Sequence, residues 1–134
     1  MHIDGRCHCG AVEYAAEVDP ASAKICHCTD CQTLSGSAFR TVVFTREGTF
    51  ALRQGRLTTY VKTAESGRKR EQGFCPTCGT PIYSTAPGDG PKVHALRLGT
   101  VRQRDEIVPR AQTWARSAQG WIGTIGTMAA SERD

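Results

Sequence analysis

The sequence has no long apolar run, no internal repeat and no low-complexity block. Its longest hydrophobic stretches, such as Val42-Val43-Phe44, are far too short to span a bilayer core of about 30 Å. The N-terminus also lacks an apolar segment of signal-peptide length. We therefore expect a soluble, cytoplasmic protein that does not enter a membrane.

Aromatic residues are scarce and the charge is only mildly basic. Phe, Trp and Tyr make up 7% of the chain, and 17 Lys and Arg against 13 Asp and Glu leave a formal net charge of +4. A surface for single-stranded nucleic acid needs aromatic side chains interleaved with basic ones. This composition argues against a nucleic-acid partner and is compatible with small anionic ligands.

A chain of 134 residues is the size of one domain and can bury about two thirds of its unfolded surface. Short runs of strand-forming residues alternate with turn residues along it, which predicts a mainly β fold. We expect a turn at residues 19–22, one domain over residues 1–126 and a frayed tail at 127–134. The expected strands cover residues 11–18, 37–44, 49–53, 57–62, 80–84, 93–98 and 111–115.

The chain has seven cysteines, in three closely spaced groups. Such spacing in a reducing cytosol is typical of metal ligands, and Cys-x-Cys pairs are poor disulfide partners. Thiolate-rich sites of this kind favour zinc. The groups are Cys7 and Cys9, then Cys26, Cys28 and Cys31, then Cys75 and Cys78.

The odd number of cysteines divides naturally into four plus three. A closed structural zinc takes four protein ligands, whereas a catalytic zinc takes three and leaves one position open. With Zn–S bonds of about 2.3 Å, neighbouring sulfurs lie about 3.8 Å apart, a separation that the central triplet can reach locally. The two outer pairs would then complete the other site.

The alternative is that both sites are structural and that His27, another side chain or a water closes the second. His27 as a ligand or general base is disfavoured, because the middle residue of an extended Cys-x-Cys segment points away from its neighbours. Thr29-x-x-Gln32 matches a capping box, which predicts a helical turn from Asp30 to Gly36. Cys31 would lie in its first turn, where free N–H groups stabilise a thiolate.

Three motifs occur in order along the chain. They are Gly5-x-Cys7-x-Cys9-Gly10-x-Val12-x-Tyr14, Cys26-His27-Cys28-x-x-Cys31-Gln32-x-x-Ser35-Gly36 and Phe74-Cys75-x-x-Cys78-Gly79-Thr80-x-Ile82. Together they resemble the motifs of the glutathione-dependent formaldehyde-activating enzyme family, which also includes the centromere protein V domain. The resemblance covers most of the chain.

The resemblance implies a beta-tent fold of small antiparallel sheets stapled by two zinc ions per chain. One zinc would be structural, on Cys7, Cys9, Cys75 and Cys78, and the other catalytic, on Cys26, Cys28 and Cys31. The family's activity joins glutathione, the co-substrate, to formaldehyde and gives S-hydroxymethylglutathione, which is a carbon–sulfur lyase reaction in reverse. The expected partners are thus a small thiol and a small aldehyde.

An anionic three-thiolate zinc site would repel the two carboxylates of glutathione, so basic residues are needed near it. The candidates are Arg40 and the run Arg68, Lys69 and Arg70. We also expect Gln32 and Ser35, with Arg40, to contact the thiol substrate.

One departure from the family pattern lies near the C-terminus. Many members carry His-x-Trp there, whereas this chain has Gln112-Thr113-Trp114. The alternative hypothesis is therefore a zinc-stabilised binding module that has kept the fold without the reaction. Nothing in the sequence indicates an oligomeric state.

Overall fold

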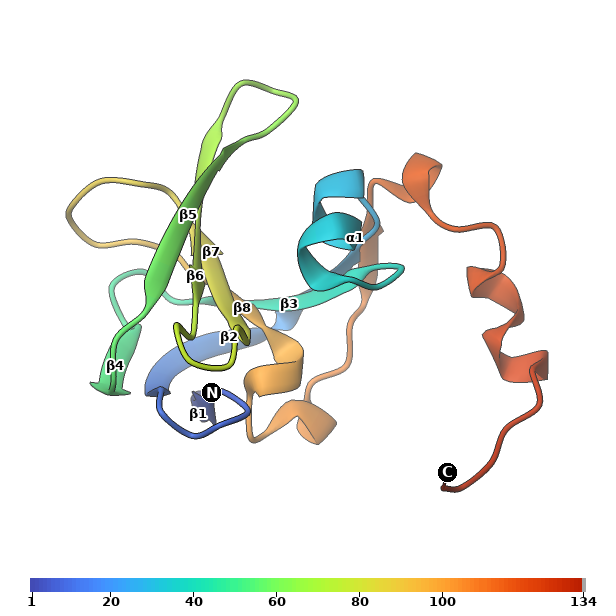
Figure 1. Ribbon diagram of the computed structural model, residues 1–134, viewed down its shortest axis with the longest axis horizontal. Helices are drawn as coiled ribbons and strands as arrows, with labels where there is room; N and C mark the ends of the chain where they lie inside the picture. Colours follow the sequence, from blue (N-terminus) through green and yellow to red (C-terminus); the bar gives the residue numbers. More distant parts are fainter. Residues whose placement is uncertain (134) are drawn as a thin grey trace.

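The computed structural model describes residues 1–133, and its strands form a mainly antiparallel sheet (Figure 1). The strand order is β1-β2-β3-β8-β7-β6-β5, with β4 and β9 also paired to β2. The pairing of β2 with β9 is parallel. The predicted mainly β fold is confirmed. The strands are β1 (His2–Arg6), β2 (Glu13–Cys26), β3 (Arg40–Thr45), β4 (Ala51–Gln54), β5 (Thr58–Thr63), β6 (Lys69–Phe74), β7 (Pro81–Thr85), β8 (Ala95–Arg97) and β9 (Ala111–Thr113).

Strand β2 runs through the predicted turn at residues 19–22. It is 14 residues long and pairs with β1 and β4 in its first half and with β3 and β9 in its second. The register to β3 shifts between Asp19 and Lys24, where Asp19 accepts hydrogen bonds from Ala21 and Ser22. The turn prediction is wrong because these local bonds bulge the strand without reversing the chain. As a result, β2 carries Cys26 to the side of β3 and β9.

The core lies where β1, β2, β3, β7 and β8 meet. Its largest fully buried side chain is Tyr14, whose hydroxyl lies 2.7 Å from the hydroxyl of Thr100. A Cβ at Gly5 would overlap the Tyr14 ring, so only glycine fits on the paired strand β1. Ile82 and Leu96 fill the centre of the same core without any exposed surface.

The one α-helix of residues 1–133, α1 (Thr29–Ser35), lies between the β5–β6 hairpin and the C-terminal segment (Figure 1). Lys62 on β5 forms a 2.8 Å ion pair with Asp30 of the helix. On the other side, Nε2 of Gln32 donates a 2.9 Å hydrogen bond to the carbonyl of Ser117. The short helix is therefore tied to both flanking segments.

Short 3₁₀ turns connect and follow the last strands. The structure shows no helix within residues 1–133 that is long and apolar enough to cross a membrane. The predicted tail begins at Thr127, the last residue of η4, and includes residue 134, which lies outside the described residues. The domain boundary therefore stays a prediction. The 3₁₀ turns are η1 (Leu98–Thr100), η2 (Arg104–Glu106), η3 (Ala115–Ser117) and η4 (Ile122–Thr127).

Candidate metal centre and its flanking cavities

Two separate groups of thiols come together in the fold, and they match the division into four and three. The four-thiol cluster joins the β1–β2 loop to the β6–β7 turn, so it connects segments that are 66 or more residues apart. The three-thiol cluster lies at the end of β2 and the start of α1. The clusters consist of Cys7, Cys9, Cys75 and Cys78, and of Cys26, Cys28 and Cys31.

The four-thiol cluster has the dimensions of a closed zinc site. The sulfur of Cys9 lies 3.6 Å from that of Cys7 and 3.8 Å from that of Cys75. A tetrahedral zinc with Zn–S bonds of about 2.3 Å requires about 3.8 Å. The Thr80 hydroxyl, 3.1 Å from the Cys78 sulfur, helps to lower the pKa of Cys78 to about 5 by hydrogen bonding. The donor set and its spacing therefore fit a structural zinc.

The three-thiol cluster is open on one side. Its sulfurs all lie within 4.8 Å of one another, and within residues 1–133 no further Cys, His, Asp or Glu completes the group. Each of the three cysteines is half-buried. Such a set fits a metal that keeps one coordination position free for a ligand.

The start of α1 is part of this cluster. The sulfur of Cys28 accepts a 3.3 Å hydrogen bond from the backbone N–H of Cys31, so Cys28 caps the helix. The prediction of Thr29 as the cap is wrong by one residue, because sulfur replaces the usual oxygen acceptor. The predicted end of the helix is confirmed, since Gly36 has the left-handed conformation with φ of 62°.

The thiols of this cluster also form hydrogen bonds with one another. The hydrogen bond between Cys26 and Cys31 lowers the pKa of Cys26 to about 4 and raises the pKa of Cys31. At neutral pH the cluster therefore already carries negative charge. A dication that binds there would displace the remaining protons.

Two nearly buried arginines lie beside the three-thiol cluster. Arg40 is 5% exposed and pairs with Cys26 across β3 and β2, while Arg97 on β8 is 8% exposed. None of the ion pairs within residues 1–133 involves either arginine. Burial lowers the pKa of Arg97 to about 9 and also lowers that of Arg40, whereas the nearby thiols act to raise both. The thiols are thus the negative groups that balance the two guanidinium ions.

Arg97 was not found from the sequence. It lies 57 positions from Arg40, and the pairing of β3 with β8 brings the two side by side. Its Nη2 donates a 2.6 Å hydrogen bond to Oε1 of Gln72, and its Nε has no hydrogen-bond partner. No local motif marks such a residue.

Of the three residues predicted to contact a thiol substrate, two are engaged inside the protein. Nε2 of Gln32 donates to the carbonyls of His27 and Ser117 at 2.8 and 2.9 Å. The hydroxyl of Ser35 donates to the carbonyl of Gln32 at 3.3 Å. These bonds give Gln32 and Ser35 a role in holding α1 in place, whereas Arg40 faces a cavity.

The buried ring of His27 is not part of the three-thiol group. Its Nε2 donates a 2.7 Å hydrogen bond to Oε1 of Gln112, and the ring packs edge-on against Phe39. The backbone N–H of His27 donates to the carbonyl of Thr113 at 3.0 Å. His27 therefore fixes the backbone of the cluster to β9.

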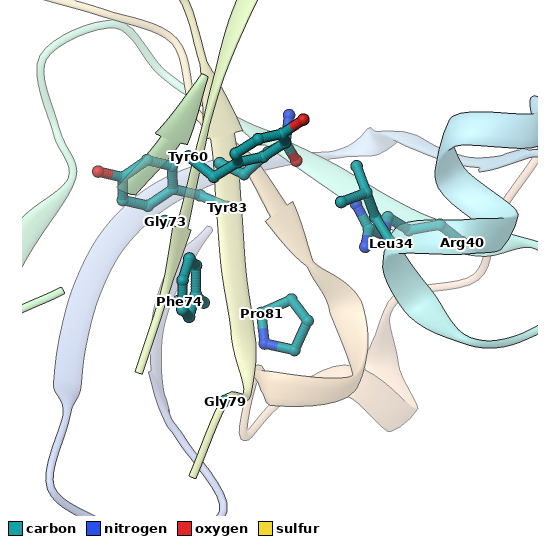
Figure 2. Close-up of a pocket in the computed structure, with 9 residues that line it drawn as sticks. Leu34, Arg40, Tyr60, Gly73, Phe74, Gly79, Pro81 and Tyr83 are labelled. Carbon is teal, nitrogen blue, oxygen red and sulfur yellow. The ribbon is translucent and has the colours of Figure 1, made fainter. Parts of the chain in front are cut away.

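Beside Arg40 lies an apolar cavity of about 340 Å³, between α1 and the sheet of β5, β6 and β7 (Figure 2). Aromatic rings and a proline line its sheet side, and Leu34 and Arg40 close the other side. The lining residues are Leu34, Arg40, Tyr60, Gln72, Gly73, Phe74, Gly79, Pro81 and Tyr83.

Separate from this cavity are two hollows of about 320 and 470 Å³ that share Ala64, Glu65 and Trp114, which we together call the polar groove. The first hollow includes Cys28, and the second contains basic side chains. Arg68 and Arg70, two of the predicted basic residues, lie here together with Lys24, whereas the predicted Lys69 is exposed outside both hollows. The lining residues of the groove are Cys28, Thr29, Asp30, Lys62, Thr63, Ala64, Glu65, Trp114 and Ser117 in the first hollow, and Lys24, Phe44, Ala64, Glu65, Ser66, Arg68, Arg70, Val93 and Trp114 in the second.

Trp114 links the two hollows and has an unusual backbone. Its φ of 57° makes it the single non-glycine residue with positive φ within residues 1–133. For a bulky residue this conformation is strained. The ring is 41% exposed, and the guanidinium of Arg116 lies 5.2 Å from its centre. Trp114 thus presents an aromatic surface to both hollows.

These features define a mainly antiparallel β protein with one closed and one open thiol cluster, each suited to a metal. The family model described as glutathione-dependent formaldehyde-activating enzyme matches residues 2–117. The chain belongs to this family. A search of curated protein sequences finds no significant match.

A solved structure shares the fold. It is the crystal structure of a Rhodobacter sphaeroides protein, a Northeast Structural Genomics target, with a TM-score of 0.61 and 24% sequence identity. The match covers 82% of this chain and 99% of that one. At this identity the likeness shows a common fold.

Proposed function

We propose that this chain is a cytoplasmic, zinc-dependent enzyme of the carbon–sulfur lyase type, which joins a glutathione-like thiol to a small aldehyde such as formaldehyde. The observation that carries the proposal is the contrast between the two thiol clusters. The four-thiol cluster has a full tetrahedral donor set, whereas the three-thiol cluster leaves one position open beside two arginines.

The charges around the open position favour a thiolate. Zinc held by Cys26, Cys28 and Cys31 would supply a soft coordination position for a sulfur or a carbonyl oxygen. Three thiolates and one dication have a formal charge of −1, and Arg40 and Arg97 add two positive charges nearby. The resulting net positive charge attracts a further anionic sulfur.

The polar groove offers a place for the rest of the thiol substrate. It begins at Cys28 and continues past the Trp114 ring to Lys24, Arg68 and Arg70. Guanidinium and ammonium groups at this end suit the carboxylates of a glutathione-like molecule. The sulfur would then lie near the three-thiol cluster and the carboxylates at the basic end.

In the reaction, the thiolate sulfur attacks the carbonyl carbon and forms the S–C bond. The carbonyl π pair moves to oxygen, which takes up the proton that the thiol released. A thiol with a pKa of about 8.5 is a few per cent ionised at pH 7, so full ionisation gains at most roughly thirtyfold. The larger gain must come from holding the thiol and the aldehyde side by side.

The test is the rate at which thiol and aldehyde exchange at equilibrium, because the uncatalysed addition is already fast. Exchange between ¹³C-formaldehyde hydrate and S-hydroxymethylglutathione is measured by NMR on the zinc-replete protein. We expect the wild type and the Thr33→Ser control to accelerate exchange, and Cys31→Ser to match the protein-free sample.

If the wild type matches the protein-free sample as well, the enzyme hypothesis is wrong for this substrate pair. Glutathione binding without acceleration would instead support the alternative of a zinc-stabilised binding module. The substitution of the family histidine by Gln112 is the feature that favours this alternative.

A further inference from the structure

The apolar cavity is much larger and less polar than formaldehyde requires. Its volume of about 340 Å³ falls in the range of roughly 300–1,000 Å³ typical of small-molecule sites. Formaldehyde has two heavy atoms and no apolar substituent. Most of the lining side chains are aromatic or aliphatic, and Arg40 and Gln72 are the polar exceptions apart from two tyrosine hydroxyls.

The wall of the cavity is rigid. Tyr83 is 8% exposed, and its ring lies directly over Gly73, where a Cβ would approach it to 2.6 Å. The Tyr83 hydroxyl donates to Glu71 at 3.3 Å, so its polar end is engaged. Pro81 adds a fixed ring between Phe74 and the helix side of the cavity (Figure 2). Such a wall presents a preformed apolar surface.

The wall formed by Leu34 and Arg40 connects the cavity to the three-thiol cluster. Leu34 follows Cys31 by three positions on α1, which places both on neighbouring parts of the helix surface. Arg40 is paired with Cys26, and Figure 2 shows its guanidinium beside Leu34 at the edge of the cavity. The cavity therefore extends away from the reacting centre.

The cavity does not suit the thiol substrate. Glutathione carries two carboxylates and two amides, and apolar walls would leave these groups without hydrogen-bond partners. The polar groove, which includes Cys28, offers such partners. The cavity and the groove thus differ in the ligand chemistry that they accept.

We propose that the preferred aldehyde of this chain carries an aromatic or long aliphatic substituent, and that this substituent occupies the apolar cavity while the carbonyl oxygen faces Arg40. This inference rests on the proposed function. The sulfur adds to the carbonyl carbon, the π pair goes to oxygen, and the thiol proton ends on that oxygen as a hemithioacetal forms. Arg40, which has no carboxylate partner within residues 1–133, stabilises the negative charge that develops on the oxygen.

The test compares two unhindered aldehydes of similar carbonyl reactivity, butanal and 3-phenylpropanal, with glutathione as the thiol. We expect kcat/KM for 3-phenylpropanal to exceed that for butanal by about tenfold or more. Tyr60→Ala, which removes one wall, should reduce this ratio at least threefold. Val61→Ala is the matched control, since Val61 follows on β5 and does not line the cavity.

A binding measurement separates this inference from the reaction itself. The unreactive alcohol 3-phenylpropanol is titrated into the protein, and NMR follows the methyl signals of Leu34. We expect saturable shifts in the wild type and in Val61→Ala, and weaker binding in Tyr60→Ala.

Each remaining outcome contradicts a different statement. Equal kcat/KM for the two aldehydes, or a ratio that Tyr60→Ala leaves unchanged, overturns the inference and leaves the proposed function intact. Binding of 3-phenylpropanol without thiol addition to any aldehyde, formaldehyde included, overturns the proposed function and with it the assignment of the cavity to an aldehyde.

Discussion

Nε2 of His27 donates a 2.7 Å hydrogen bond to Oε1 of Gln112, a residue 85 positions further along the chain. His27 lies between two cysteines of the open cluster, and its side chain is fully buried. Because its Nδ1 has no hydrogen-bond partner, the bond to Gln112 is the one polar contact of the ring within residues 1–133. The glutamine that departs from the family pattern thus positions the backbone of the cluster.

Loss of this bond should destabilise the fold. We expect Gln112→Ala to lower the free energy of unfolding by about 1–3 kcal/mol, because it leaves a buried imidazole without any partner. Gln112→Glu keeps an acceptor oxygen and should recover most of the loss. Urea unfolding measures both variants, with Gln54→Ala as a control that removes an exposed hydrogen bond. Equal stabilities for Gln112→Ala and the wild type would contradict the role given to this pair.

The two thiol clusters should differ in what their metal does for the protein. We expect two zinc ions per chain, with one lost in Cys31→Ser at little cost to the free energy of unfolding. Cys75→Ser should also lose a zinc but destabilise the fold by several kcal/mol, because its cluster joins distant segments. Metal analysis and thermal unfolding measure these effects. Unchanged metal content in Cys31→Ser would rule out the two-site arrangement.

Trp114 should matter for ligand binding and little for stability. Trp114→Gly removes the cost of about 1–2 kcal/mol that the left-handed conformation imposes on a non-glycine residue, and Trp114 is 41% exposed. We therefore expect unchanged or higher stability, together with severalfold weaker glutathione binding in calorimetry. Trp121→Gly is the control, since Trp121 is similarly exposed and lies outside the polar groove. A variant that unfolds, or that binds glutathione as the wild type does, would contradict this role.

His94 should make the stability depend on pH. Burial lowers the pKa of His94 to about 4, and its ring stacks on Phe50 at 4.6 Å. Between pH 6.5 and pH 4 the unfolded chain binds a proton that the folded protein does not. Its contribution is thus fully present above pH 6.5 and is lost as the pH falls, by roughly 2 kcal/mol at pH 4.5.

The variant His94→Phe keeps the ring stacking and removes the titrating group. Urea unfolding gives the free energy of unfolding of the wild type and this variant at pH 7 and pH 4.5. Both proteins have the same thiol clusters, so the pH effects of the clusters cancel in the difference between the two proteins. We expect the variant to lose less stability on acidification. An identical loss in both proteins would show that His94 does not titrate as described.

How much could be predicted from the sequence depended on how local each feature was. The end of α1 follows from Gly36, since a left-handed residue that stops a helix favours glycine. The bulge in β2 did not follow, because Asp19 to Ser22 are ordinary turn residues. The chain bends there without reversing only because β2 pairs with β3 on both sides of this segment. Likewise, Cys28 as a cap was missed because a thiol is not a usual helix cap.

The sequence by itself determined that the seven cysteines form two pairs and a triplet, because Cys-x-Cys and Cys-x-x-Cys spacing brings sulfurs together locally. The meeting of the two outer pairs, which are 66 or more residues apart, depends on the fold. Only the tertiary structure decided what surrounds the open cluster. Arg97 on β8, Gln112 on β9 and Trp114 just after β9 reach it from distant parts of the chain, and the β5–β7 sheet opposite α1 forms the apolar cavity. Such contacts depend on strand pairing and packing between segments far apart in the chain, and no local spacing encodes them.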